Sequence, residues 1–178
     1  MNLSDIRFPR QLEADETAET IRKVLMARTV KLWPGGTLDV ARITMDGPLK
    51  KVLRTAMLMG RIRCGFEAIF DRLESERKGI MNVRERRCTP YGDRVSRLLL
   101  FSNDGAERFY RHIESLLQAN APRLLGCLLD IDGCALGNLL TGKDRPIKLV
   151  MAEHKDLVSE TLRTIVAGQD QGCPAKVS

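Results

Sequence analysis

Four segments of the chain carry apolar residues at the spacing of a half-buried helix. The clearest begins at Pro48, because proline suits the first turn of a helix, and it ends before Gly60. The others begin near Phe66, after Asp104 and near Leu157. We predict helices whose apolar stripes are Leu49, Val52, Leu53, Ala56 and Met57; Phe66, Ile69, Phe70 and Leu73; Phe109, Ile113, Leu116 and Leu117; and Leu157, Leu162 and Ile165.

Continuously apolar runs, typical of buried strands, alternate with these helices. They lie at 95–101, 124–131 and 147–151, and a short helical turn at 135–140 precedes the last of them. Asp104 and Glu107 are spaced as a capping box for the helix after the first run. The alternation predicts an α/β fold with a mixed or parallel sheet and helices on both of its faces.

The signals divide the chain into unequal parts. Residues 1–46 hold one weak helical pattern and two short alternating stretches, which indicate an N-terminal arm or small subdomain. Residues 47–168 form the main α-β-α domain, and 169–178 form a flexible tail. Within the domain, periodicity disappears at 77–94, where we expect a long basic loop as an insertion.

The net charge of the chain says more about its partners than its overall composition does. The formal net charge is +6 and the sequence pI is near 9.3, which suits a partner rich in phosphate or, alternatively, a mildly basic surface tuned for solubility. The five cysteines are odd in number and form no C-x-x-C pair, so we expect free thiols in a reducing compartment. With no signal peptide or membrane-length apolar run visible, we expect a cytoplasmic protein, nucleolar or nuclear if eukaryotic, without a membrane partner.

A catalytic site is hard to assemble from this sequence. Only two histidines occur, at His112 and His154, and neither has a nucleophile at a suitable spacing. The nucleotide-binding patterns G-x-G-x-x-G and G-x-x-x-x-G-K-[ST] are absent. We therefore expect no enzyme, no cofactor and no metal site, although an α/β enzyme using Asp104 or Asp130 stays open as a less favoured alternative.

Basic residues are the remaining candidates for chemistry. They cluster on the first helix of the domain and the turn after it, in the 77–94 stretch, and before the last strand. If the turn after Met59 and the segment before Ile147 lie together on one edge of the sheet, they form a surface that can follow a phosphate backbone. The alternative is a solvated face. The candidates are Lys50, Lys51, Arg54, Arg61, Arg63, Arg84, Arg86, Arg87, Lys143, Arg145 and Lys148.

The order of these segments resembles the kink-turn-binding ribosomal proteins of the L-seven-Ae and L-thirty-e type. The similar stretches are LRTAMLMGRIRCGFEAI at 53–69, RLLLFSND at 97–104, ALG at 135–137, where that family has ELG, and GKDRPIKLVMA at 142–152. The resemblance covers about residues 48–167. It implies a three-layer α-β-α sandwich around a mixed central sheet of about four strands.

The resemblance also implies an RNA-binding surface. By position, it places Gly65, Phe66 and Glu67 on one side of that surface, and Leu136, Gly137, Lys143 and Arg145 on the other. The family pattern G-x-N-E is followed by a lysine, whereas this chain has GFEA at 65–68 and Asp71 at the lysine position. The fold is therefore better supported than kink-turn specificity.

Two functional hypotheses follow from the sequence. The first is a non-catalytic RNA-binding protein, a component of a ribosome or other ribonucleoprotein particle, whose partners are structured RNA and the other subunits of that particle. Under this hypothesis Arg61, Arg63, Arg84, Arg86 and Arg87 join the positions implied by the resemblance as RNA contacts. The second is a degenerate member of the same fold that acts as a protein-interaction module. The sequence leaves the oligomeric state open.

Overall fold

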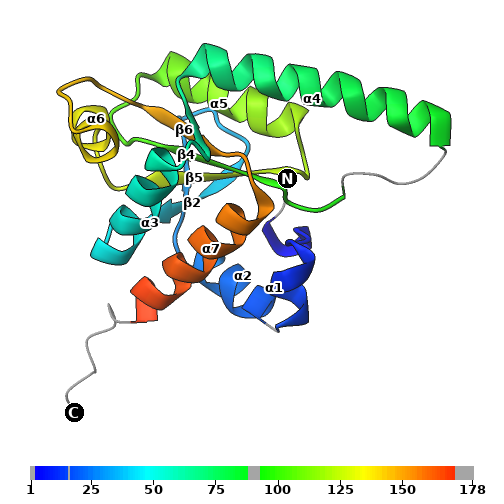
Figure 1. The fold of residues 1–178 in the computed structure, drawn as a ribbon, viewed down its shortest axis with the longest axis horizontal. Helices are drawn as coiled ribbons and strands as arrows, with labels where there is room; N and C mark the ends of the chain where they lie inside the picture. Colours follow the sequence, from blue (N-terminus) through cyan, green and yellow to red (C-terminus); the bar gives the residue numbers. More distant parts are fainter. Residues whose placement is uncertain (1–2, 16, 88–92, 171–178) are drawn as a thin grey trace.

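Helices and strands alternate along the chain in a computed structural model that describes residues 3–15, 17–87 and 93–170 (Figure 1). The elements are η1 (Leu3–Asp5), α1 (Arg10–Ala14), α2 (Thr17–Ala27), β1 (Thr29–Lys31), β2 (Asp39–Ile43), α3 (Gly47–Leu58), β3 (Ile62–Cys64), α4 (Phe66–Arg87), β4 (Arg97–Phe101), α5 (Glu107–Ala119), β5 (Leu124–Leu129), α6 (Gly133–Thr141), β6 (Leu149–Ala152) and α7 (Lys155–Asp170).

The strands form one six-stranded mixed sheet in the order β1-β2-β5-β4-β6-β3. Strand β5 pairs in parallel with β2 and β4, while β6 runs antiparallel to β4 and β3. The central strands β4, β5 and β6 are mostly or wholly buried, which explains why their sequences are continuously apolar.

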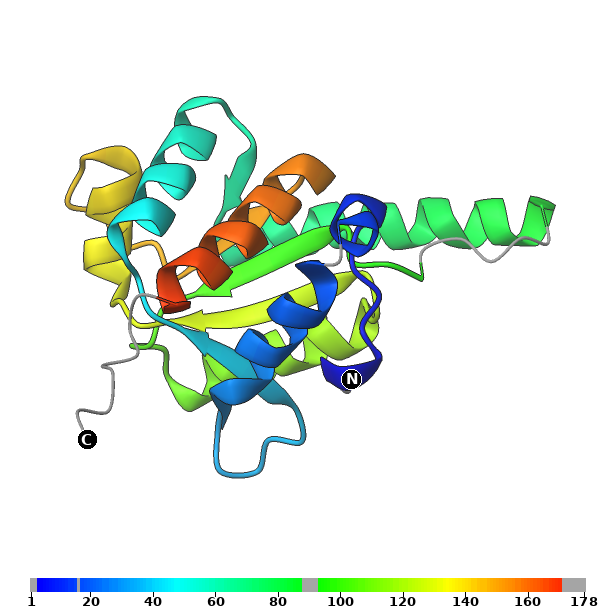
Figure 2. The ribbon, with the colours of Figure 1, turned by 90° about the horizontal axis from the view of Figure 1, so that it is seen from below.

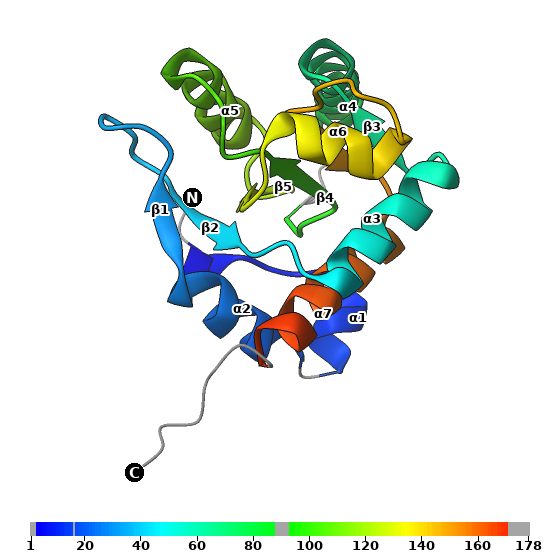
Figure 3. The ribbon, with the colours of Figure 1, turned by 90° about the vertical axis from the view of Figure 1, so that its left-hand side faces the viewer.

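Helices cover both faces of this sheet (Figure 3). One hydrophobic cluster joins α4 and α5 to one face through residues such as Ile69 and Ile113. The other cluster joins α1, α2, α3, α6 and α7 to the opposite face through residues such as Leu53 and Leu162. The expected three-layer arrangement is thus confirmed, but the sheet has six strands instead of about four.

The two additional strands come from the first 46 residues. Strand β2 pairs in parallel with β5, with Ala41 opposite Cys127, and the hairpin partner β1 forms the edge of the sheet. Apolar residues of α1 and α2, including Leu12 and Leu25, belong to the same core cluster as α3 and α7. The segment expected as an arm or small subdomain therefore shares the sheet and the core of the rest.

A buried carboxylate ties this N-terminal hairpin to α5. The Oε1 of Glu114 accepts bonds from the backbone N–H of Thr37 at 2.6 Å and of Leu38 at 3.0 Å, and Oε2 accepts one from Nε1 of Trp33 at 2.5 Å. Burial raises the pKa of Glu114, but these hydrogen bonds outweigh it and leave the pKa below its ordinary value. The carboxylate stays ionised and fixes the turn between β1 and β2.

The stretch expected as a long basic loop is helical over most of its length. Helix α4 continues through Arg87 and projects beyond the rest of the molecule (Figure 2). Beyond Leu73 it has no continuous apolar stripe, so it lacks the periodicity that reveals a helix in sequence. Glu74 forms ion pairs with Arg77 at 2.8 Å and Lys78 at 4.0 Å, which favour the helix. Positions 88–92 of the predicted loop, and the predicted tail after 170, lie outside the described residues.

Candidate nucleic-acid interface

The turn between β3 and α4 lies beside the start of β6. The backbone N–H of Gly65 donates to the carbonyl oxygen of Leu149 at 3.0 Å, extending the antiparallel pairing of β3 with β6. Gly65 has φ +89°, a conformation that glycine adopts without strain, and open space surrounds the position of a Cβ. Gly65 and Glu67 are exposed and Phe66 is half-buried, so the structure brings these predicted residues to the start of the α6–β6 loop.

The α6–β6 loop, residues 142–148, presents two cations. Lys143 and Arg145 are exposed, and neither side chain has an ion-pair partner within the described ranges. The loop is held against α6, since a Cβ on Gly137 would stand only 1.7 Å from the carbonyl oxygen of Arg145. Leu136 is fully buried and Gly137 is buried with it. These two predicted positions hold the loop, while Lys143 and Arg145 face solvent.

Asp104 fixes the base of this loop. It accepts hydrogen bonds from Oγ of Ser102 at 2.6 Å and from the N–H of Gly133 at 3.0 Å, and its Oδ2 lies 3.1 Å from Nζ of Lys148. Burial raises the pKa of Asp104, but these contacts outweigh it and lower the pKa from its ordinary value. The predicted capping box is wrong: the N-cap of α5 is Ala106, and the Asp104 side chain bonds instead to Gly133 of α6 and to Lys148 of the α6–β6 loop.

Of the two predicted cations after Met59, Arg61 directly precedes β3 and Arg63 is the middle residue of that strand. Arg63 is opposite Met151, and the N–H of Glu153 donates to the carbonyl of Arg61. Strand β3 therefore separates Arg61 from the loop by about 13 Å. Nε of Arg63 also donates to Glu153 at 2.8 Å, and that hydrogen bond raises the pKa of Arg63. Arg61 therefore lies away from the α6–β6 loop, and Arg63 is engaged by Glu153.

The arginines Arg84, Arg86 and Arg87 lie in the final turns of α4. An α-helix rises about 1.5 Å per residue, so Arg84 is about 27 Å along the axis from Phe66. The structure thus does not bring this group to the α6–β6 loop. Helix α3 contributes exposed Lys50, Lys51 and Arg54, but Lys50 shares a groove with the carboxylates of Asp132 and Asp144.

An aromatic groove between α4 and α5 begins at the same turn. The Phe66 ring lies 6.2 Å from that of Phe70 and 5.7 Å from that of His112, measured between centroids. The groove has a volume of about 340 Å³, and Phe70 is 42% exposed. The sequence did not reveal this contact of His112, because its partner ring belongs to another helix.

The acidic candidates for catalysis are engaged in structural contacts. Asp130 forms an ion pair with Nη2 of Arg42 at 2.6 Å, and Asp104 holds the loop as described above. In residues 3–15, 17–87 and 93–170, no three metal-ligating side chains gather into a cluster. No helix in that part of the chain combines the length and the apolar character needed to cross a bilayer.

Comparisons with known proteins find matches among solved structures. No protein-family model matches the chain, and no curated protein is similar to it in sequence. A solved structure described as a Giardia lamblia 15.5kD RNA binding protein is similar over 70% of this chain and 86% of its own length, with a TM-score of 0.44 and 12% sequence identity.

Proposed function

We propose that this protein binds structured RNA, without catalysis, through the surface formed by the β3–α4 turn and the α6–β6 loop. We further propose that it works as a subunit of a ribosome or other ribonucleoprotein particle. The observation that carries the proposal is the pair Lys143 and Arg145, two exposed cations without ion-pair partners in the described residues, on the loop that leads to Leu149, which accepts a hydrogen bond from Gly65 of the β3–α4 turn. Unpaired cations are the groups that exchange counterions for phosphate on binding.

Each part of the surface has a role that its chemistry supports. Lys143 and Arg145 contact phosphates and fix the position of the RNA, which does not require base recognition. Phe66 and Phe70 offer ring faces on which an unpaired base can stack, a common mode of RNA recognition. Glu67 and Asp71 are exposed on α4 nearby, so the RNA backbone should approach from the loop side.

The decisive experiment compares two double variants. Lys143→Ala with Arg145→Ala should weaken binding of a structured RNA about tenfold and reduce the slope of log K against log salt by about 1.5. The matched control is Lys23→Ala with Arg28→Ala, two exposed cations on and just after α2, near the β1 edge of the sheet and away from the β6–β3 edge. Fluorescence anisotropy at several salt concentrations measures both. Equal affinities of the two double variants would overturn the proposal.

The aromatic groove supplies a second, independent test. Phe70→Ala removes an exposed ring and should weaken RNA binding about five- to tenfold, as expected for loss of one stacked base. Phe70→Tyr keeps the ring and should bind like the parent. If Phe70→Ala binds RNA normally while the loop variant does not, the groove has no part in the interface.

A protein-interaction module on the same surface is the second candidate. The observation that favours it is the apolar groove flanked by carboxylates, since Glu67 and Asp71 repel phosphate. Absence of RNA binding at low salt, where electrostatic attraction is strongest, would favour this candidate over the first.

A further inference from the structure

The turn between α3 and β3 exposes two large apolar side chains. Leu58 is 80% exposed and Met59 is 62% exposed, and both values exceed those of the other exposed large apolar residues in the described ranges. Figure 3 shows this turn at the periphery of the molecule, where α3 ends and the chain turns back into β3. Neighbouring apolar side chains that the fold leaves uncovered, with polar residues around them, are typical of a surface at which another molecule binds.

Backbone hydrogen bonds fix the conformation of this turn. The N–H of Gly60 donates to the carbonyl oxygen of Met57 at 3.1 Å, and the N–H of Arg61 donates to that of Ala56 at 2.9 Å. With Gly60 at φ +66°, these two bonds form the Schellman motif, which ends many helices. The backbone that carries the apolar pair is therefore ordered before a partner arrives, so that binding loses little conformational entropy there.

Arginine side chains flank the apolar pair. Arg54 lies one helical turn before Leu58 on the same face of α3, and Arg61 follows Met59 by two residues. Both arginines are exposed, and neither has a carboxylate partner within the part of the chain that the structure describes. Guanidinium groups bind carboxylates through two parallel hydrogen bonds, so the charge of this surface is complementary to that of an acidic partner.

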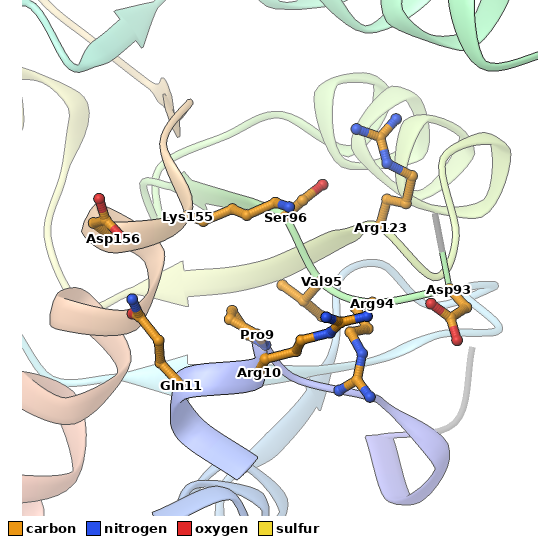
Figure 4. A pocket seen from close by; sticks show the side chains of 10 residues that line it. All are labelled: Pro9, Arg10, Gln11, Asp93, Arg94, Val95, Ser96, Arg123, Lys155 and Asp156. Atoms are coloured by element: carbon orange, nitrogen blue, oxygen red, sulfur yellow. The ribbon is translucent and has the colours of Figure 1, made fainter. Parts of the chain in front are cut away.

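The next cation along the neighbouring segment belongs to a different surface. The N–H of Glu153 donates to the carbonyl oxygen of Arg61, so the chain that leads to Lys155 passes beside the turn. Figure 4 shows the Lys155 side chain extending toward Ser96, in a pocket that residues before α1 and before β4 also line. We therefore define the α3 tip as Arg54, Leu58, Met59 and Arg61 alone.

The chemistry of the α3 tip favours a protein over RNA or a lipid bilayer. Leu58 and Met59 have no ring face on which a base can stack, so RNA would leave them in contact with water. No Trp or Tyr lies in residues 47–61, and these are the side chains that commonly anchor a protein at a bilayer surface. Methionine and arginine are instead enriched in protein–protein interfaces.

We propose that the α3 tip binds an acidic segment of another protein. Apolar side chains of that segment cover Leu58 and Met59, and its carboxylates accept hydrogen bonds from Arg54 and Arg61. Strand β3 separates this turn from Gly65 and the proposed RNA interface, so the two surfaces are distinct. The inference goes beyond RNA binding and does not depend on it.

Selection of displayed peptides tests the proposal. Random short peptides on phage are selected on the full chain and then depleted on the double variant Leu58→Ser with Met59→Ser, which should melt like the parent because both side chains are exposed. The remaining peptides should combine Asp or Glu with apolar residues. A parallel selection depleted on Met26→Ser, an exposed methionine of α2, should leave no such peptides. The proposal is overturned if no peptide distinguishes the parent from the double variant, or if the remaining peptides are basic or uncharged.

Titration of the most enriched acidic peptide measures the contribution of the apolar pair. Leu58→Ser with Met59→Ser should weaken binding at least about tenfold, as expected for loss of the centre of an interface. Methyl NMR of the methionine-labelled protein locates the contact, because the Met59 signal should shift with the peptide. It should not shift with a structured RNA, or with vesicles of phosphatidylcholine and phosphatidylserine in a ratio of three to one. A Met59 shift with RNA or vesicles but not with the peptide would assign the surface to that ligand and overturn the proposal.

Charge variants separate the arginines of the α3 tip from the net charge of the protein. Arg54→Gln with Arg61→Gln should weaken peptide binding about fivefold at low salt, and less at high salt. The matched control, Lys23→Gln with Arg28→Gln, removes the same charge from exposed positions on and just after α2 and should bind like the parent. Equal losses in the two double variants would contradict the proposal, since net charge alone would then account for binding.

Discussion

Two basic regions of this molecule differ in what their charges contact. On α4, Arg72 pairs with Glu76 at 3.0 Å, and Arg77 and Lys78 pair with Glu74. On the α6–β6 loop, Lys143 and Arg145 have no such partner within the described part of the chain. The count of basic residues therefore overstates the charge that is available to a ligand. What matters is which cations the fold leaves without a carboxylate.

The largest expected effect comes from removing the carboxylate at the centre of the paired region. Glu76 is bonded to Arg97 at 2.7 Å, to Arg72 at 3.0 Å and to Arg123 at 3.4 Å, and its side chain is only 12% exposed. Glu76→Ala should lower the free energy of unfolding by about 3 kcal/mol, because it leaves partly buried guanidinium groups unbalanced. Urea denaturation measures the change.

Glu74 provides the control for this prediction. Its partners Arg77 and Lys78 are largely exposed, so Glu74→Ala should cost only about 0.5 kcal/mol. Equal losses in the two variants would mean that burial does not distinguish these ion pairs.

The second effect concerns the support of the loop. Gly137→Ala should lower the free energy of unfolding by about 2 kcal/mol, since its Cβ would meet the carbonyl of Arg145. It should also weaken RNA binding, because Lys143 and Arg145 move with that backbone. The control is Gly79→Ala in α4, where nothing lies within 4 Å of the added Cβ. That variant should gain about 0.5–1 kcal/mol.

The third effect depends on pH. The pKa of Asp104 is lowered in the folded protein, so its stabilisation is present above the ordinary pKa of about 4 and is lost as the pH falls through the folded value. Asp104→Asn should cost about 1 kcal/mol at pH 7, a modest value because the carboxylate is partly exposed to solvent. Thermal unfolding from pH 7 to pH 3 should show the parent and variant converging. A constant difference would show that the Asp104 charge has no role.

The smallest expected effect is on RNA affinity, and it comes from releasing arginines from an ion pair. Glu153→Gln weakens the contacts to Arg63 and Arg72, which lie 2.8 and 3.4 Å from its carboxylate. RNA affinity should rise about two- to threefold if these arginines border the interface, as expected from removing a like charge to phosphate. An unchanged anisotropy titration would limit the interface to the loop and the α4 turn.

Local patterns in the sequence were sufficient to predict the central helices and strands. The apolar stripe after Pro48 and the run from Leu98 to Phe101 correspond to α3 and β4. Helix α3 buries one face at the helical period, and β4 is buried on both faces, which makes its sequence continuously apolar. The end of α4 could not be predicted in this way, since its exposed turns carry no stripe. The pairing of β2 with β5 joins residues more than 80 positions apart, as Ala41 and Cys127 show, and no local pattern encodes that contact.

The residues of the candidate site could be predicted only in part, because some of its contacts also join distant positions of the chain. Of the positions assigned from the sequence, Lys143 and Arg145 are exposed, whereas Leu136 and Gly137 are buried. The pairing of Arg63 with Glu153 links residues 90 positions apart and could not be read from charge spacing.

The two edges of the sheet have a consequence for self-association. Both outer strands, β1 and β3, are only three residues long. Each edge therefore offers few free backbone N–H and C=O groups to a strand from another molecule. Lys31 on β1 forms an ion pair with Asp39 at 3.1 Å. A strand that added to this edge would have to remove water from these charges. The fold should therefore resist edge-to-edge aggregation at high protein concentration.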